Sequence, residues 1–579
     1  MVTTDEPRPA AKADLNSDGL ERHVGFFGLL WSSEGSIIGS GWLFGALTAA
    51  TIAGPSAIFS WVIMSVIIIV LALIHAELGG LFPVSGGSSR FPHYAFGSLA
   101  GAVFGWFAYI QAATVAPIEV LAAIQYMSTA SWAKGFYSSS GSLTASGIVV
   151  AVILMVFFVA VNVIGVSWLA RVNNALTIWK VGLPILAVIV LMITSFHSGN
   201  FSAGGGFYVK GAELKSIFVA IPAGGIVFSL LGFEQAAQLA GEAKDPKKDL
   251  PRAIIMSILL GSAIYILAQI AFIAALDPHL FAHGTTWADL ANPKHSATVK
   301  ALNAAPFYKV ASLAGLAWLA FLLRLDAVVS PAGTGLIYLT SGSRIGFGLS
   351  KNGSVPVVFE KASGRSKVPV FGILFTAAIG LLFLLPFPAW NKLVGVVTVA
   401  SILMYAGAPL ALGALRGQKP NLERAYRLPA ASILAPVGFI LANYVIMWAG
   451  WPTYSTMIVV MIIGLLLMGS SIAFKLNPNT PRMDWGAAIW IVPYLVGMGF
   501  ITYLDSYVGQ SDNGAAIGGI GPFKDVLVGG KGHLGFGWDF LVVAIFSLAI
   551  YYLAMRTRLP EAKVDHYVRE VYPPPEGGH

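Results

Sequence analysis

Long apolar runs recur along the chain and are separated by short polar segments. Residues 62–73, 148–163, 181–193 and 457–468 are four such runs, and most of them lie inside windows of about 20 apolar residues, the length of a bilayer-crossing helix. In lipid, only helices and closed barrels satisfy the backbone, and the alternating pattern of a barrel is absent here. The pattern therefore predicts an all-α integral membrane protein.

The runs predict about 14 transmembrane helices. They are expected at 24–50, 56–80, 97–128, 146–168, 174–195, 215–240, 251–276, 305–340, 369–386, 391–415, 430–450, 453–475, 485–504 and 537–556. An even number places both termini on one side, and the positive-inside rule then assigns most of the 35 Lys and Arg residues to the cytoplasm. We expect a plasma or inner membrane protein with both termini cytoplasmic.

This topology divides the chain into four parts. They are an N-terminal tail (1–23), a twelve-helix core (24–475), two additional helices with an outside loop (476–556) and a solvated C-terminal tail (557–579). No functional role is predicted for the two additional helices, and oligomerisation through them stays open.

Composition narrows the function classes. Only 11% of the 579 residues are charged, against roughly 25% in soluble domains, and the net charge of +8 is explained by orientation and anionic lipid rather than by nucleic acid. The chain has no cysteine, which excludes thiolate metal sites and cysteine nucleophiles. We find no phosphate-binding glycine loop, no His-Glu-x-x-His pair and no nucleophile elbow. Neither enzyme chemistry, a cofactor nor a metal is indicated, so an ion gradient is the expected energy source.

Two predicted helices carry glycine-rich interruptions. Residues 35–41 read Gly-Ser-Ile-Ile-Gly-Ser-Gly, and residues 224–234 are again interrupted by glycine, five helices later. Each glycine costs a helix about 1 kcal/mol relative to alanine, and such segments persist in a bilayer where they line a cavity. Unwinding of the first frees the amides of Ser40 and Gly41 for a substrate carboxylate. Close helix packing through small residues is the alternative, but paired breaks favour an inverted-repeat transporter.

These segments resemble the amino acid–polyamine–organocation superfamily. Residues 35–41 match its Gly-x-Ile-Ile-Gly-Ser-Gly signature, and 228–234 with 241–252 are similar to its Phe-x-x-x-Gly-Phe-Glu and Glu-x-x-(Asn/Asp)-Pro patterns. Two further motifs, at 76–87 and 344–356, lie in the same order. The resemblance covers about 24–475 and implies two five-helix inverted repeats, spans 1–5 and 6–10, around an amino-acid site.

The resemblance also implies roles for individual residues. Ile37, Ser40 and Gly41 would bind the substrate α-carboxylate, Phe228 would be an aromatic gate, and carbonyls near Phe228 and Leu231 would receive the α-ammonium. The segment 326–335 is most similar to that of bacterial proton-coupled acidic amino-acid symporters.

Ionisable residues at bilayer depth are functional candidates because burying them is costly. They are Lys180 and Arg324 among the bases, and Glu34, Glu119, Glu234 and Asp326 among the acids. Four acids cannot all be ionised and paired with two bases, so at least some of these carboxylates should be protonated or reach water. We therefore infer proton coupling.

Each base has two interpretations. By resemblance, Lys180 would bond carbonyls of the broken first helix in place of a cation; otherwise it snorkels near a helix end. Arg324 would bind a substrate side-chain carboxylate bidentately, or form a salt bridge to Glu119 or Glu34.

The acids are equally open. Glu119 is the candidate partner of Lys180 or a helix-packing residue. Glu34 adds a carboxylate to the site or caps local backbone, and Glu234 is a proton-linked gate or a structural bond to backbone. Asp326 lies two residues from Arg324 and cannot pair with it on one helix face.

The sequence thus favours a proton-coupled amino-acid symporter that leans to aspartate and glutamate. Its partners would be a small amino acid, protons and the bilayer. An exchanger, or a potassium or polyamine carrier of the same fold, is the main alternative; a non-transporting receptor or a channel is a weaker one.

Overall fold

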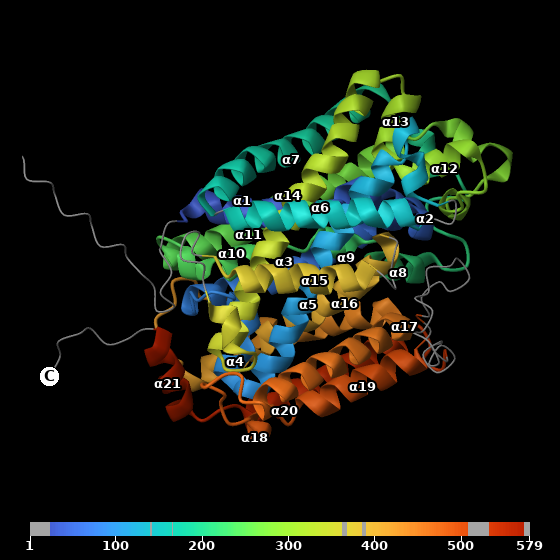
Figure 1. Cartoon of the computed structure of the whole chain (residues 1–579). Helices are drawn as coiled ribbons and strands as arrows, with labels where there is room; N and C mark the ends of the chain where they lie inside the picture. Colours follow the sequence, from blue (N-terminus) through green and yellow to red (C-terminus); the bar gives the residue numbers. More distant parts are fainter. Residues whose placement is uncertain are drawn as a thin grey trace, which may run out of the picture.

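The computed structural model describes residues 24–138, 142–164, 166–361, 368–384, 390–505, 507 and 532–571. Helices make up 79% of it, and no strand forms within these ranges. The helices run side by side in one bundle, with α12 (Ala297–Ala304) near one end and α21 (Glu561–Val571) near the other (Figure 1). We call these the α12 end and the α21 end.

The remaining helices follow in chain order. In the first half they are α1 (Phe26–Ile37), α2 (Gly41–Ala53), α3 (Ala57–Leu81), α4 (Gly87–Phe96), α5 (Ser98–Met127), α6 (Ala145–Ile164), α7 (Val166–Thr194), α8 (Glu213–Ala223), α9 (Ile226–Ser229), α10 (Gln235–Gln238) and α11 (Pro246–Ala275). In the second half they are α13 (Pro306–Leu313), α14 (Ala317–Lys351), α15 (Val370–Leu384), α16 (Trp390–Gln418), α17 (Ala431–Ala473), α18 (Trp485–Ala488), α19 (Ile491–Leu504) and α20 (Trp538–Thr557).

The predicted membrane spans all correspond to helices. Ten stretches of the described chain are long and apolar enough to cross a membrane, and α15 is a shorter apolar helix. One stretch, Gly41–Leu81, contains both α2 and α3, and α17 contains two predicted spans that meet at a kink at Gly450. Together with the broken first and sixth spans, this confirms the all-α multi-pass fold.

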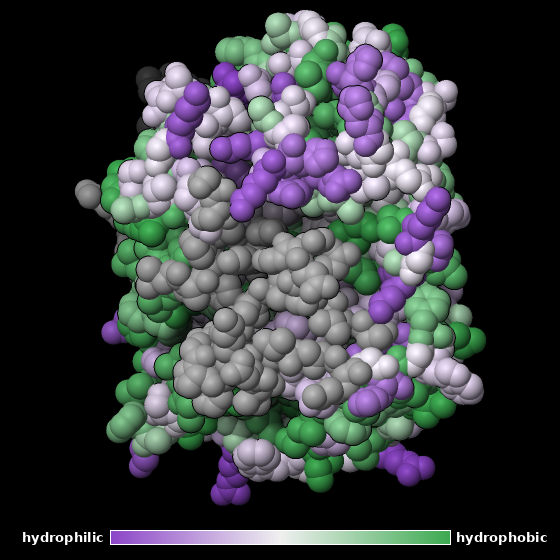
Figure 2. Space-filling model, turned by 90° about the vertical axis from the view of Figure 1, so that its right-hand side faces the viewer, coloured by the Kyte–Doolittle hydropathy of each residue, from purple (hydrophilic) through white to green (hydrophobic). Residues whose placement is uncertain are grey.

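The sides of the bundle are apolar, as a lipid environment requires. Ile153 and Phe157 on α6 and Leu466 on α17 are more than half exposed. Figure 2 views the α12 end and shows hydrophilic side chains gathered on its upper part, with hydrophobic side chains along the edges. Exposed apolar flanks between polar ends indicate that the long axis of the helices crosses the bilayer.

Two features of the α21 end differ from the expectations. Helix α14 continues to Lys351, beyond the predicted end of the eighth span near 340, and thus includes Arg344, which forms an ion pair with Glu242. The C-terminal segment is not simply a solvated tail, since α21 packs on α4, with the Tyr567 ring 4.7 Å from that of His93. Aromatic side chains in the tail, which the charge pattern obscured, explain this packing.

Glu77 joins α3 to α16 at the same end. Its carboxylate accepts hydrogen bonds from Arg416 at 2.7 and 2.6 Å and from the Leu428 amide at 2.7 Å, and it forms an ion pair with Arg424 at 2.9 Å. Because the carboxylate is buried, removing it would leave two arginines without their counter-charge.

The two broken spans meet through glycines. The first break separates α1 from α2 at residues 38–40, and the second separates α8, α9 and α10. Gly232, in the second break, has a φ of 125°, and a Cβ there would lie 2.6 Å from Ser36 Cβ and 2.8 Å from the Ile37 amide nitrogen. Both the backbone conformation and the close approach therefore require glycine.

We expect Gly232→Ala to destabilise the protein by about 1–3 kcal/mol or more, because it adds a strained φ and a steric clash between the breaks. Thermal unfolding of the purified protein in detergent measures this as a lower melting temperature. Gly182→Ala is the matched control, since a Cβ at this α7 position meets open space. Equal melting temperatures for the two variants would contradict the glycine contact.

Candidate functional site: a pocket between the broken helices

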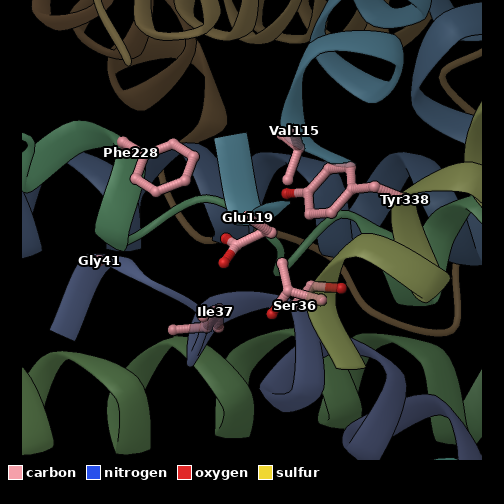
Figure 3. A pocket seen from close by; sticks show the side chains of 9 residues that line it. Ser36, Ile37, Gly41, Val115, Glu119, Phe228 and Tyr338 are labelled. Atoms are coloured by element: carbon pink, nitrogen blue, oxygen red, sulfur yellow. The ribbon is translucent and has the colours of Figure 1, made fainter. Parts of the chain in front are cut away.

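A narrow pocket lies where the two breaks face each other. The residues that line it come from α1 and α2, α5, α9 and α14: Ser36, Ile37, Gly39, Gly41, Val115, Glu119, Phe228, Thr334 and Tyr338. Figure 3 shows the side chains of Glu119, Phe228 and Tyr338 reaching this space from different elements. Four expected substrate-binding or coupling residues, Ile37, Gly41, Glu119 and Phe228, are thus brought together.

The first break exposes backbone groups that a continuous helix would pair internally. The Ile37 carbonyl accepts a hydrogen bond from the Tyr265 hydroxyl at 2.7 Å, and the Ser40 amide donates to Glu119 Oε2 at 2.8 Å. The first amides of α2 have no partner one turn earlier in their own helix, and its dipole places partial positive charge there. This end of α2 is suited to a carboxylate.

Gly41 brings the first break against the second. A Cβ at this position would lie 2.8 Å from Ser229 Cα and 2.9 Å from Ser229 Cβ, and it would also meet the Ser229 hydroxyl. Leu231, in the second break, is buried but does not line the pocket, and its amide donates to the Phe228 carbonyl.

Lys180 binds the broken helix from α7. Its ammonium donates to the Gly35 carbonyl and, at 2.8 Å, to Thr334 Oγ1, and the residue is fully buried. Thr334 in turn donates toward the Gly35 carbonyl at 2.9 Å. A snorkelling lysine would have an exposed ammonium, so the alternative interpretation of Lys180 was wrong.

Glu119 and Lys180 interact electrostatically, but no carboxylate oxygen of Glu119 lies within 4 Å of the Lys180 ammonium, so they form no direct ion pair. Oε2 of Glu119 is held by the Ser40 amide, and Oε1 is buried with no hydrogen-bond partner among the described residues. The carboxylate therefore belongs to the break itself rather than to a Lys180–Glu119 salt bridge.

Glu34 fits neither predicted role in this conformation. It is fully buried, it does not line the pocket, and both carboxylate oxygens lack hydrogen-bond partners in the described part of the chain. It interacts electrostatically with Lys180. No three acidic or histidine side chains of the described residues are grouped so as to hold a metal ion.

Asp326 is fully hydrogen-bonded away from the pocket lining. It accepts from Trp42 Nε1 at 3.0 Å, Trp179 Nε1 at 2.8 Å and the Ser330 hydroxyl at 2.6 Å. Its carboxylate thus ties α2, α7 and α14 together. As expected, it does not pair with Arg324.

Arg324 lies outside the pocket lining. Its guanidinium carbon is 4.4 Å from the centroid of the Tyr308 ring, and it donates a hydrogen bond to the hydroxyl of the same residue. Stacking on Tyr308 holds the side chain at the α13–α14 junction, so in this arrangement Arg324 is not placed to contact a ligand in the pocket, and its substrate role stays a prediction. Among the described residues Arg324 forms no ion pair with Glu119 or Glu34.

Glu234 forms the predicted structural bond to backbone, and its role as a proton-linked gate stays a prediction. It accepts from the Gly232 amide at 3.0 Å, which is a bond within the break, and from Tyr405 at 2.5 Å and Gln111 at 2.8 Å, which connect the break to α16 and α5. The neighbouring Gln235 accepts from Ser341 on α14. This polar cluster closes the pocket toward the α21 end.

An aromatic cluster closes the pocket toward the α12 end. Trp390 packs on Phe44, with ring centroids 5.0 Å apart, and edge-to-face on Phe228 at 5.8 Å. Its indole nitrogen donates to the Ser40 hydroxyl at 2.9 Å. Phe228 and Trp390 thus pack together beside the first break, and the sequence had not singled out Trp390. The role of Phe228 as a gate stays a prediction.

Three more residues at the site were missed: Thr334, Tyr338 and Ser36. Ser36 lies inside the glycine-rich motif, so the motif itself was a signal for it. Thr334 lies in the segment 326–335 that was singled out for its resemblance, but nothing in its spacing marked it as a partner of Lys180. Tyr338 is one turn further along the same helix face, which an i, i+4 projection from Thr334 would have found.

Two broken helices facing each other across a closed polar pocket, inside an apolar bundle, define a membrane transporter of the inverted-repeat class. The chain belongs to the amino acid permease family, whose model matches residues 24–468. It is a permease and not an enzyme.

Similar proteins extend the match to most of the chain. The glutamate/serine transporter AimA of Bacillus subtilis is 35% identical over 547 residues, which cover 93% of this chain and 94% of the relative. The aspartate-proton symporter of the same organism is 33% identical over 549 residues, covering 94% and 98%. The branched-chain amino acid permease BcaP is 26% identical over 481 residues, covering 79% and 94%.

We expect Gly41→Val to abolish substrate binding, because the larger side chain would push Ser229 and the second break away from the first. Equilibrium binding of labelled amino acids to the purified variant measures this. Gly469→Ala, on α17 where a Cβ meets open space, should bind normally. Normal affinity in Gly41→Val would contradict the placement of the site.

Proposed function

We propose that the protein is a proton-coupled amino-acid symporter that works by alternating access and prefers aspartate and glutamate. The observation that carries this proposal is the fully buried Lys180 ammonium bound to the Gly35 carbonyl of the broken helix, with Glu119 bound to the Ser40 amide of the same break. Both groups gain or lose a proton, and both hold backbone that must rearrange during transport.

Lys180 supplies the coupling in this proposal. Charged, its ammonium fixes α1 to α14 through the Gly35 carbonyl and Thr334; neutral, the amine is a much weaker donor and the contact loosens. A proton bound at this position thus substitutes for a cation that would bridge the same two helices.

The substrate would occupy the pocket between the breaks. Its α-carboxylate would bind the amides of Ser40 and Gly41 at the start of α2, assisted by Ile37, and its α-ammonium would approach the carbonyls near Phe228 and Leu231. The Phe228–Trp390 cluster and the Glu234 cluster would open alternately. In this scheme Glu34, Glu119, Glu234 and Asp326 are the buried acids available for proton movement.

The preference for acidic substrates draws support from the relatives, two of which are named for the transport of glutamate or aspartate. Arg324 supplies no support in this conformation. Among the described residues no cationic side chain lines the pocket, so we propose that a substrate side-chain carboxylate is accepted by hydroxyl groups, such as those of Ser36, Thr334 and Tyr338.

The orientation also belongs to the proposal. Lys244, Lys247, Lys248 and Arg252 lie together near the start of α11, on the side that the positive-inside rule assigns to the cytoplasm. We therefore place the α21 end, and both termini, in the cytoplasm of a cell whose plasma or inner membrane contains the protein.

Uptake into proteoliposomes of the purified protein, with an imposed inward proton gradient, tests the proposal. Aspartate, alanine, arginine and potassium are compared. The proposal expects aspartate accumulation that a protonophore collapses. Substrate exchange without gradient-driven accumulation would identify an exchanger, and potassium movement alone would refute amino-acid transport.

Lys180→Ala should abolish proton-driven accumulation while leaving exchange of internal for external substrate, because the substrate site persists but the titrating ammonium is lost. Lys294→Ala, an exposed residue near α12, is the control and should behave as the wild type. The two assays are run on the same proteoliposomes. Undiminished accumulation in Lys180→Ala would end its coupling role.

A further inference from the structure

Glu119 occupies the backbone amide to which the proposed function assigns the substrate. We propose that its carboxylate is an internal competitor for the substrate α-carboxylate, so that the substrate binds only after a proton has neutralised Glu119. This inference rests on the proposed function and adds to it an order of events: proton first, substrate second.

The geometry of the Glu119 carboxylate supports competition. Oε2 accepts from the Ser40 amide at 2.8 Å, which is a charge-assisted hydrogen bond when Glu119 is ionised. Oε1 is buried without a hydrogen-bond partner among the described residues, which makes it the oxygen available to receive a proton. Figure 3 shows the carboxylate at the centre of the residues that line the pocket, with Phe228 above it and Ile37 below.

Gly39 allows this approach. A Cβ at residue 39 would lie 2.5 Å from Glu119 Oε1 and 2.8 Å from Thr334 Oγ1. The first break can therefore accept the carboxylate of α5 only because residue 39 has no side chain. The glycine-rich signature thus serves an internal carboxylate as well as the substrate.

Charge explains why the two carboxylates exclude each other. Two anions at one amide, in a site shielded from water, repel strongly, and the amide can make only one good hydrogen bond. Protonation of Oε1 removes the negative charge and weakens the bond from Ser40, since a neutral acceptor binds an amide less strongly than an ionised one. The Ser40 amide then becomes available to the substrate.

Other titratable groups face the same region, and their effects on the pH dependence of binding must be distinguished from that of Glu119. Lys180 on α7, Tyr265 on α11 and Tyr338 on α14 interact with Glu119 electrostatically, while Glu34 on α1 and Asp326 on α14 act on Lys180. Lys180 is bound to Gly35 and Thr334 rather than to the Ser40 amide. A pH dependence that originates in Lys180 would therefore survive the replacement of Glu119.

Equilibrium binding to the purified full-length protein in nanodiscs, across a series of pH values, tests the inference. The probes are aspartate and its α-carboxamide analogue, which lacks the competing charge. For the wild type we expect aspartate affinity to fall with rising pH by up to about tenfold per unit, the limit for linkage to one proton. The α-carboxamide should show a much flatter profile.

Two variants complete the test. Glu119→Gln imitates the protonated acid and should bind aspartate with an affinity that falls much less steeply with pH than in the wild type, any remaining slope coming from Lys180. Glu119→Asp keeps a titrating carboxylate and should retain the steep profile. An unchanged steep profile in Glu119→Gln, or equal profiles for aspartate and the α-carboxamide in the wild type, would overturn competition.

The outcome for the proposed function is read separately. If wild-type protein shows gradient-driven aspartate uptake but the pH profiles of binding differ from those expected, the symporter proposal is retained and competition by Glu119 is refuted. If no amino acid binds or is transported, the proposed function itself fails. Should Glu119→Gln not fold, the comparison of the two ligands on wild-type protein still decides the question.

Discussion

The contact between the two broken helices is the constraint on which the rest of the structure depends. Gly41 lies against Ser229, and Gly232 lies against Ser36 and Ile37, at distances that leave no room for a Cβ. These contacts hold the two unwound segments side by side inside an apolar bundle, where backbone polar groups without hydrogen-bond partners are otherwise costly in free energy. The pocket, the helix terminus that lines it and the buried charges around it are all consequences of that meeting.

The buried charges are organised by the exposed backbone of the first break. Lys180 binds the Gly35 carbonyl on one side, and Glu119 binds the Ser40 amide a few residues further on. Each charged side chain thus binds a backbone group of complementary polarity, and the two side chains do not bind each other directly. A change in the protonation of either group would act directly on the first break. The same break contains the amides proposed to bind the substrate, so no chain of intervening residues is needed to connect proton binding with substrate binding.

The pocket is closed by different kinds of contact at its two ends. Toward the α12 end the pocket is covered by aromatic rings of Phe44, Phe228 and Trp390, which separate without leaving buried charge behind. Toward the α21 end it is covered by the hydrogen bonds of Glu234 with Gln111 and Tyr405. We infer that opening to that end must replace these polar bonds with water, and that opening to the other need not.

Much of the fold followed from the sequence because hydrophobic length and glycine composition are local signals. The spans and the two breaks came from such signals. The family resemblance came from short motifs in order, and the contact of Lys180 with the broken first helix was implied only by that resemblance. What could not be predicted depends on contacts between distant segments. Trp390 comes from a span far along the chain, Arg324 is held by stacking on Tyr308, and the packing of α21 depends on Tyr567 meeting His93.

The central claim is that the pocket between the breaks is the amino-acid site. Because the chain contains no cysteine, a single introduced thiol reports on one position without background. Val115→Cys lines the pocket from α5, and Thr194→Cys at the exposed end of α7 is its control. We predict that aspartate slows alkylation of the thiol at 115 and leaves that at 194 unchanged. Transport of aspartate with no protection at 115 would contradict the account.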